Sequence, residues 1–153
     1  MIVFKHEKDK RNLTLIAKPL QAIAAEMDAW LRKNYKIDLC ITATLSTLAE
    51  DQALNRVSSS HREGRAFDVA IRTWTPTILR SFIEFFNAKY SDLGAVSKTD
   101  GFRRFIVHKA HGSGPHLHVQ IGKDILSQTT KPKQPKGESD GKSVRSKRTA
   151  KQA

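Results

Sequence analysis

The spacing of apolar residues predicts two amphipathic helices. From Leu20 to Tyr35, apolar side chains recur at intervals of three and four residues, and Pro19 stands near the start, where proline favours a helix N-terminus. From Pro76 to Tyr90, bulky apolar residues again gather on one side. Each helix therefore has one face suited to packing in a hydrophobic core.

Shorter segments with other patterns predict strands. Residues 37–44 alternate apolar and more polar positions with a period of two, which is typical of a half-buried strand. We also expect strands at residues 67–71, 105–108 and 116–121, and a loop with a short helix at residues 45–56. The resulting order, α, β, α, β, α, β, β, indicates an α+β domain in which helices back a small, mostly antiparallel sheet.

The composition changes near residue 126. Residues 127–153 contain 8 basic residues, 2 acidic residues and a single bulky aliphatic residue, Val144. Burying so little apolar surface cannot offset the conformational entropy lost when the segment becomes ordered. We therefore expect one globular domain, residues 1–126, followed by a disordered basic tail, residues 127–153. The tail either binds an anionic polymer, from the cell envelope or a nucleic acid, or is only an unstructured, solubilising end.

Charge and cysteine content exclude several classes of protein. The chain has 27 basic and 15 acidic residues, a formal charge of +12, which favours anionic partners without choosing among them. A single cysteine, Cys40, excludes an intramolecular disulfide, a C-x-x-C redox pair and a thiolate zinc site. No apolar run approaches the ~20 residues of a membrane helix, and residues 1–11 are polar where a signal peptide is apolar. We expect a monomer made in the cytoplasm without a signal peptide.

Two separate segments carry the candidate chemistry. His116 and His118 stand two residues apart in a predicted strand, so their side chains point to the same face. Upstream, His61 and Asp68 are seven residues apart, and a tight turn at Gly64 can bring them together. If the segments meet, they offer two imidazoles and a carboxylate, a set suited to a catalytic zinc ion that keeps one position for water. Such a zinc ion lowers the pKa of its bound water from ~15.7 to about 7.

Both segments resemble motifs of a known family. Residues 59–68 read SSHREGRAFD and resemble the S-x-H-x-x-G-x-A-x-D signature of zinc peptidases that cut peptidoglycan stem peptides. That family includes D-alanyl-D-alanine carboxypeptidases and L-alanyl-D-glutamate endopeptidases, among them many phage endolysins. Residues 116–118 read HLH and are similar to the H-x-H motif of the wider group that holds lysostaphin, the penicillin-insensitive murein endopeptidase and the hedgehog fold.

This resemblance implies a fold, a cofactor and a set of roles. The fold would be that of the hedgehog and D-alanyl-D-alanine peptidase group, with one zinc ion bound by His61, Asp68 and His118. By the same resemblance, His116 is the catalytic base or stabilises the transition state, and Ser59 lies in the substrate cleft. The implied function is cleavage of a peptidoglycan stem peptide by a phage or prophage endolysin that acts on the cell wall, with the L-alanyl-D-glutamate bond preferred.

The chain departs from the family pattern at two places. Pro115 stands where carboxypeptidase-type members usually have a carboxylate, so the proton-transfer role passes to the histidine that follows it. Residues 44–47 read TLST where the family often has Gly-Tyr-Arg-Ser, so the arginine that contacts substrate is missing. A guanidinium binds carboxylates through paired hydrogen bonds, and Arg56, Arg62 and Arg65 are all candidates to replace it.

Two alternative functions stay open. One is a D-alanyl-D-alanine carboxypeptidase or D,D-endopeptidase of the same fold, with the carboxypeptidase ranked lower because of the missing arginine. The other is a non-catalytic phage structural or nucleic-acid-binding protein that binds through the basic tail. The ligand types also admit manganese or another divalent ion in place of zinc.

Overall fold

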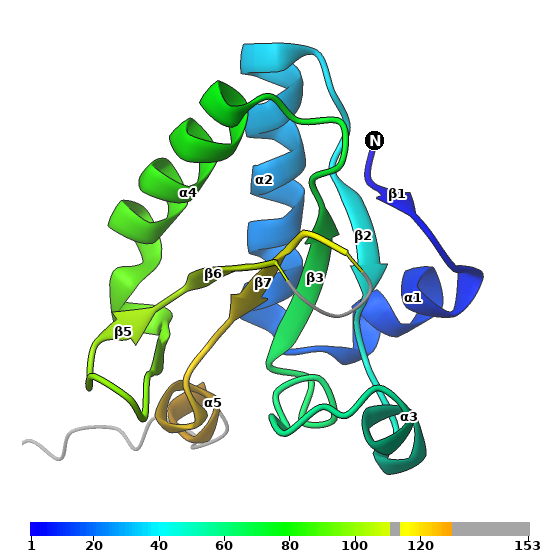
Figure 1. Ribbon diagram of the computed structural model, residues 1–153, viewed down its shortest axis with the longest axis vertical. Coiled ribbons are helices and arrows are strands. Elements are labelled where there is room, and N and C mark those ends of the chain that lie inside the picture. Colours follow the sequence, from blue (N-terminus) through cyan, green and yellow to red (C-terminus); the bar gives the residue numbers. More distant parts are fainter. Residues whose placement is uncertain (111–113, 130–153) are drawn as a thin grey trace, which may run out of the picture.

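A mixed five-stranded sheet forms the centre of the computed structural model, which describes residues 1–110 and 114–129 (Figure 1). The strand order is β1-β2-β3-β7-β6, in which β1 pairs with β2 in parallel and the other neighbouring pairs are antiparallel. The strands are β1 (Val3–Phe4), β2 (Cys40–Ala43), β3 (Ala66–Ala70), β6 (Ile106–Lys109) and β7 (His116–Gln120). The predicted α+β class is thus confirmed, with a parallel strand added at one edge.

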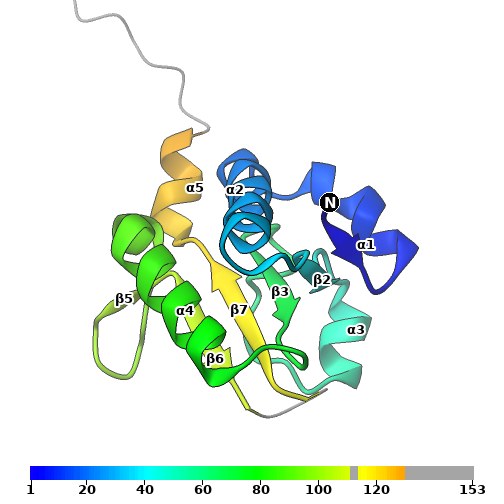
Figure 2. The ribbon, with the colours of Figure 1, turned by 90° about the horizontal axis from the view of Figure 1, so that it is seen from above.

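Two long helices, α2 (Lys18–Tyr35) and α4 (Pro76–Tyr90), run beside each other and cover the sheet (Figures 1 and 2). Their bounds agree closely with the two helices that the apolar spacing predicts. Shorter elements lie around them: α1 (Glu7–Asn12), α3 (Leu48–Ala53), α5 (Lys123–Thr129), two 3-10 turns (Leu13–Leu15 and Ser91–Leu93), and a separate two-stranded sheet of β4 (Ala95–Val96) and β5 (Arg103–Arg104).

The core lies between the two long helices and one face of the sheet. Phe82 on α4 is fully buried and is surrounded by aromatic rings, with ring centroids 4.7 Å from Phe86, 4.9 Å from Trp74 and 5.7 Å from Trp30. Other buried members include Leu20, Ile23, Met27 and Leu31 from α2, and Ile41, Phe67, Val69, Leu117 and Val119 from the strands.

The same strands carry polar residues on their other face. In β3, Phe67 and Val69 enter the core, so Asp68 between them points the opposite way. In β7, Leu117 and Val119 enter the core, and His118 points away from it. One face of the sheet therefore holds the fold together while the other carries the candidate ligands.

Several elements were not predicted by the sequence patterns. β1, α1, the β4–β5 hairpin and α5 are short, and their apolar residues are too few to set a period. The strand predicted at residues 37–44 is shorter in the structure, Cys40–Ala43. Helix α5 continues to Thr129, past the expected domain boundary at residue 126, and the rest of the predicted tail lies outside the described residues. In the described ranges, no helix has the length and apolar character that crossing a bilayer requires.

Replacing Phe82 with alanine tests the aromatic centre of the core. We expect Phe82→Ala to lower the free energy of unfolding by about 3–5 kcal/mol, because it removes a fully buried ring and leaves a cavity. The matched control is Phe85→Ala on the same helix, where the ring is 42% exposed and the loss should be about 1 kcal/mol or less. Urea unfolding followed by circular dichroism measures both, and equal losses would contradict this account of the core.

Candidate metal centre

The pairing of β3 with β7 brings together residues that are fifty positions apart in the chain. Asp68 lies directly opposite His118, and Ala70 lies opposite His116. Because directly paired residues of antiparallel strands point to the same face, the two histidines and the carboxyl group share one surface of the sheet. The predicted juxtaposition of the two motif segments is confirmed.

A tight turn before β3 supplies His61. The amide of Gly64 donates to the His61 carbonyl (3.0 Å), and the amide of Arg65 donates to the Ser60 carbonyl (2.8 Å). Gly64 has a φ of 64°, and a Cβ atom there would lie 3.3 Å from the Cα atom of Ile16. A side chain at this position would be strained and crowded, so the glycine of the motif is required by the turn that places His61.

His61, Asp68 and His118 form a buried cluster. Nε2 of His61 lies 3.1 Å from Oδ1 of Asp68, and Nδ1 of His118 lies 2.8 Å from the same oxygen. The three side chains are almost fully buried, and the two imidazole centroids are 5.0 Å apart. On its outer side, Nε2 of His118 lies 3.2 Å from the hydroxyl of Ser60.

The hydrogen bonds of His61 leave one nitrogen facing the carboxyl group. A backbone carbonyl only accepts hydrogen bonds, so Nδ1 of His61 donates to the carbonyl of Thr44, 2.6 Å away. In a neutral imidazole, Nε2 then carries a lone pair, and it points at Oδ1 of Asp68, which is also an acceptor. Two acceptors at this distance require a proton or a metal cation between them.

The electrostatics of the cluster suit a metal ion. Burial alone raises the pKa of Asp68, but the two imidazoles of His118 and His61 beside its carboxyl group outweigh it and hold that pKa well below its usual range. Burial lowers the pKa of His118 and outweighs the opposing effect of Asp68. At neutral pH, Asp68 is ionised and His118 is neutral, the states in which these side chains bind metals.

The donor set fits a divalent cation. Each of the three side chains offers one ligand atom within 4.8 Å of the other two, and two imidazoles with one carboxylate is a set that binds catalytic zinc. Ligand atoms at 2.0–2.2 Å from a tetrahedral ion are roughly 3.3 Å apart, so contacts of 2.8 and 3.1 Å need only small shifts. In the described ranges, this is the group of side chains with metal-site geometry.

His116 lies beside this cluster and outside it. Its Nδ1 donates to the carbonyl of Gly114 (2.8 Å), so a neutral ring keeps the lone pair on Nε2, which lies 3.9 Å from Oδ2 of Asp68. The ring is half-buried, unlike those of His61 and His118. Its Nε2 therefore faces the cluster and remains open to a bound molecule.

A cleft of about 640 Å³ opens from the cluster to the surface, and its lining contains His61, Asp68, His116 and His118. Ser59, which the resemblance assigns to the substrate cleft, is not among the lining residues, and its hydroxyl donates to Glu63 (2.7 Å). The next serine, Ser60, is buried and lines the cleft. The remaining lining residues are Leu54, Asn55, Arg56, Val57, Ser58 and Lys109.

Of the three candidate arginines, Arg56 is the one that lines the cleft. Its Nη2 lies 3.6 Å from Oδ2 of Asp68, and its Nη1 lies 3.7 Å from Oδ1 of the buried Asp51. Arg62 contacts the other oxygen of Asp51 (3.4 Å), and Arg65 is buried, where it donates to the Ile121 carbonyl (2.7 Å). Two carboxylates thus fix the guanidinium of Arg56 beside the cluster of His61, Asp68 and His118.

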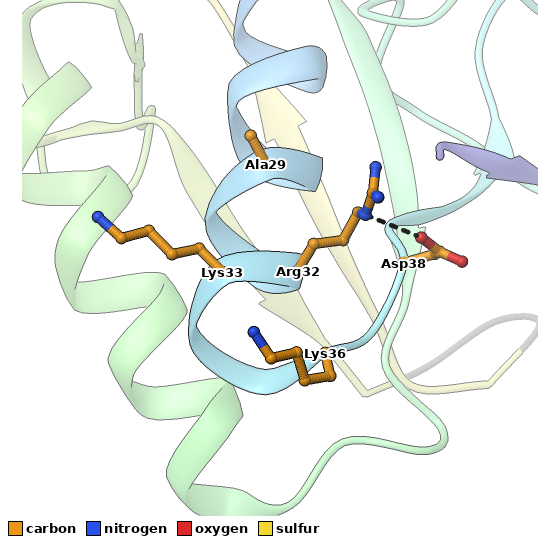
Figure 3. Close-up of a pocket in the computed structure, with 5 residues that line it drawn as sticks. All are labelled: Ala29, Arg32, Lys33, Lys36 and Asp38. Atoms are coloured by element: carbon orange, nitrogen blue, oxygen red, sulfur yellow. Dashed lines mark ion pairs between the residues drawn. The ribbon is translucent and has the colours of Figure 1, made fainter.

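Two further hollows help to define the site. One, of about 230 Å³, shares Leu54, Arg56 and Asp68 with the cleft and continues it towards α1. The other, of about 510 Å³, lies on α2 and is lined by Ala29, Arg32, Lys33, Lys36 and Asp38 (Figure 3). That hollow contains one carboxyl group and no histidine, so it offers no comparable set of metal ligands.

The sequence patterns did not identify Lys109 or Thr44 as part of this site. Lys109 at the end of β6 lines the cleft because β6 pairs with β7, where it lies opposite His116. Thr44 receives the hydrogen bond of His61 through its backbone carbonyl, and a backbone contact leaves no signature in the residue type. The pairing of the last two predicted strands could have identified Lys109, but no sequence signal identifies Thr44.

Comparisons with known proteins add no family assignment, because no protein-family model, curated protein or solved structure matches this chain.

Proposed function

We propose that the protein is a zinc-dependent peptidase that cleaves stem peptides of peptidoglycan, as a phage or prophage endolysin does, with the L-alanyl-D-glutamate bond preferred. The observation that carries the proposal is the buried cluster of His61, Asp68 and His118 at a cleft, in which Nε2 of His61 and Nδ1 of His118 both face one carboxylate oxygen of Asp68. The class of substrate rests on the resemblance of residues 59–68 and 116–118 to the peptidase motifs.

In this proposal, the cluster and two further residues of the cleft each have a chemical task. A zinc ion held by His61, Asp68 and His118 would supply a Lewis acid and make water a nucleophile near neutral pH. Nε2 of His116 takes a proton from the nucleophile and returns it to the leaving amine, since Nδ1 is occupied by the Gly114 carbonyl. The guanidinium of Arg56 binds a substrate carboxylate or the developing oxyanion.

A carboxypeptidase of the same fold is the second candidate function. From the sequence, we rank the carboxypeptidase lower because residues 44–47 lack the arginine that contacts substrate in the family. Arg56 and Lys109 at the cleft favour it, because two cations beside the cluster suit the terminal carboxylate of a D-alanyl-D-alanine peptide. The basic tail, on which the non-catalytic DNA-binding alternative depends, lies beyond the described residues.

The first test is release of amino groups from purified peptidoglycan. We expect activity that requires zinc, is lost with a chelator, and falls by more than about 100-fold in His118→Ala, because even residues outside the ligand shell cost 10–100-fold. The matched control is His108→Ala, since His108 is exposed on the neighbouring strand and does not line the cleft. That variant should keep its activity and zinc content.

Mass analysis of the products separates the two peptidase candidates. A new D-glutamate amino terminus identifies the endopeptidase, free D-alanine identifies the carboxypeptidase, and loss of cross-linked dimers identifies a D,D-endopeptidase. A folded, zinc-loaded protein that releases nothing from several types of cell wall would refute the peptidase proposal and favour the non-catalytic binding function.

The second test concerns the arginine in the cleft. We expect Arg56→Ala to lower kcat/KM on a synthetic stem peptide by about 10- to 100-fold, the range expected when a hydrogen bond to a charged group is lost. Arg62→Ala is the control, because Arg62 contacts the same Asp51 but does not line the cleft, and it should change kcat/KM less than twofold. Equal effects of the two variants, at full zinc content, would remove Arg56 from substrate binding.

A further inference from the structure

Helix α1 carries a buried acid that the cleft does not use directly. Asp9 is 1% exposed, and its Oδ1 accepts two hydrogen bonds from one residue, from the amide and from the hydroxyl of Thr44, both at 2.9 Å. Thr44 is fully buried and directly follows β2. The carboxyl group of Asp9 thereby fixes both the backbone and the side chain of Thr44.

Thr44 is also the residue that orients His61. Its carbonyl accepts the Nδ1 hydrogen bond of His61 at 2.6 Å. Thr44 thus connects two side chains through its backbone: its amide donates to Asp9, and its carbonyl accepts from His61. A shift of Thr44 would therefore move the acceptor that orients the His61 ring.

The arrangement costs free energy, which indicates that it serves more than stability. Oδ2 of Asp9 is buried and has no hydrogen-bond partner in the described part of the chain, and an unsatisfied buried polar atom costs roughly 1–3 kcal/mol. An apolar residue at this position would avoid the cost. Native proteins keep few such atoms, and each one calls for an explanation.

We propose that Asp9 is a positioning residue for the metal centre. Through Thr44, it holds the Nδ1 hydrogen bond of His61 in place, so that Nε2 is directed at the site of the cation. Groups that orient metal-bound histidines in this way contribute strongly to metal affinity. The inference rests on the proposed function only in requiring that the cluster bind zinc, and it does not depend on which bond is cleaved.

The test compares two buried acids that hold the two ends of the same strand. Asp28 is 7% exposed, and its Oδ1 accepts from the amide of Leu39 (3.0 Å), the residue before β2, with no contact to the metal cluster. We expect Asp9→Ala to weaken zinc binding by about tenfold, and Asp28→Ala to leave it within twofold. Competition with a chromogenic chelator measures the dissociation constant, and urea unfolding measures the stability of each zinc-free variant.

A milder pair of variants keeps the test decisive if Asp9→Ala does not fold. Thr44→Val removes the hydroxyl that donates to Asp9 and should weaken zinc binding, whereas Thr44→Ser keeps the hydroxyl and should restore it. A zinc affinity equal to that of the unchanged protein in Asp9→Ala, or in Thr44→Val if Asp9→Ala does not fold, would overturn the inference alone. Absence of zinc binding by the unchanged protein would overturn the proposed function, and the inference with it.

Discussion

The antiparallel pairing of β3 with β7 is the interaction on which both the fold and the site depend. Along this pairing, residue pairs point alternately to the core and to the cluster. Val69 opposite Leu117 belongs to the core, and Asp68 opposite His118 belongs to the cluster. A slip of one residue would exchange the two faces. The burial of apolar side chains on one face therefore specifies the geometry of the ligands on the other.

Around this pairing, the site is completed from the neighbouring strand. β2 pairs with β3 on the side away from β7, and its last residues lead into Thr44, which anchors His61. A register shift between Ile41 and Ala43 interrupts the ladder just before this point. Since irregular pairing often re-aims the groups beside it, the end of β2 serves the site as well as the sheet.

Much of the fold and the centre of the site could be predicted from sequence, because both depend on periodic patterns. The two long helices follow from apolar spacing, and the shared face of His116 and His118 follows from strand alternation, whereas the meeting of residues 61–68 with residues 116–118 comes from the pairing of β3 with β7. The sequence could not show which of the three candidate arginines lines the cleft, because the position of Arg56 depends on ion pairs with Asp51 and Asp68. Helix α1 escaped notice because its buried residue is an acid, Asp9, and not an apolar side chain.

The position of β7 within the sheet also has a consequence for synthesis of the chain. Within residues 1–110 and 114–129 it is the last strand, yet it lies between β3 and β6, which are both made earlier. A growing chain that ends before residue 116 therefore lacks the strand that joins the two parts of the sheet, and it lacks His116 and His118 as well. Leu117 and Val119 of the core lie on the same strand as the two histidines. A chain cut short before β7 therefore loses part of the core together with the cluster.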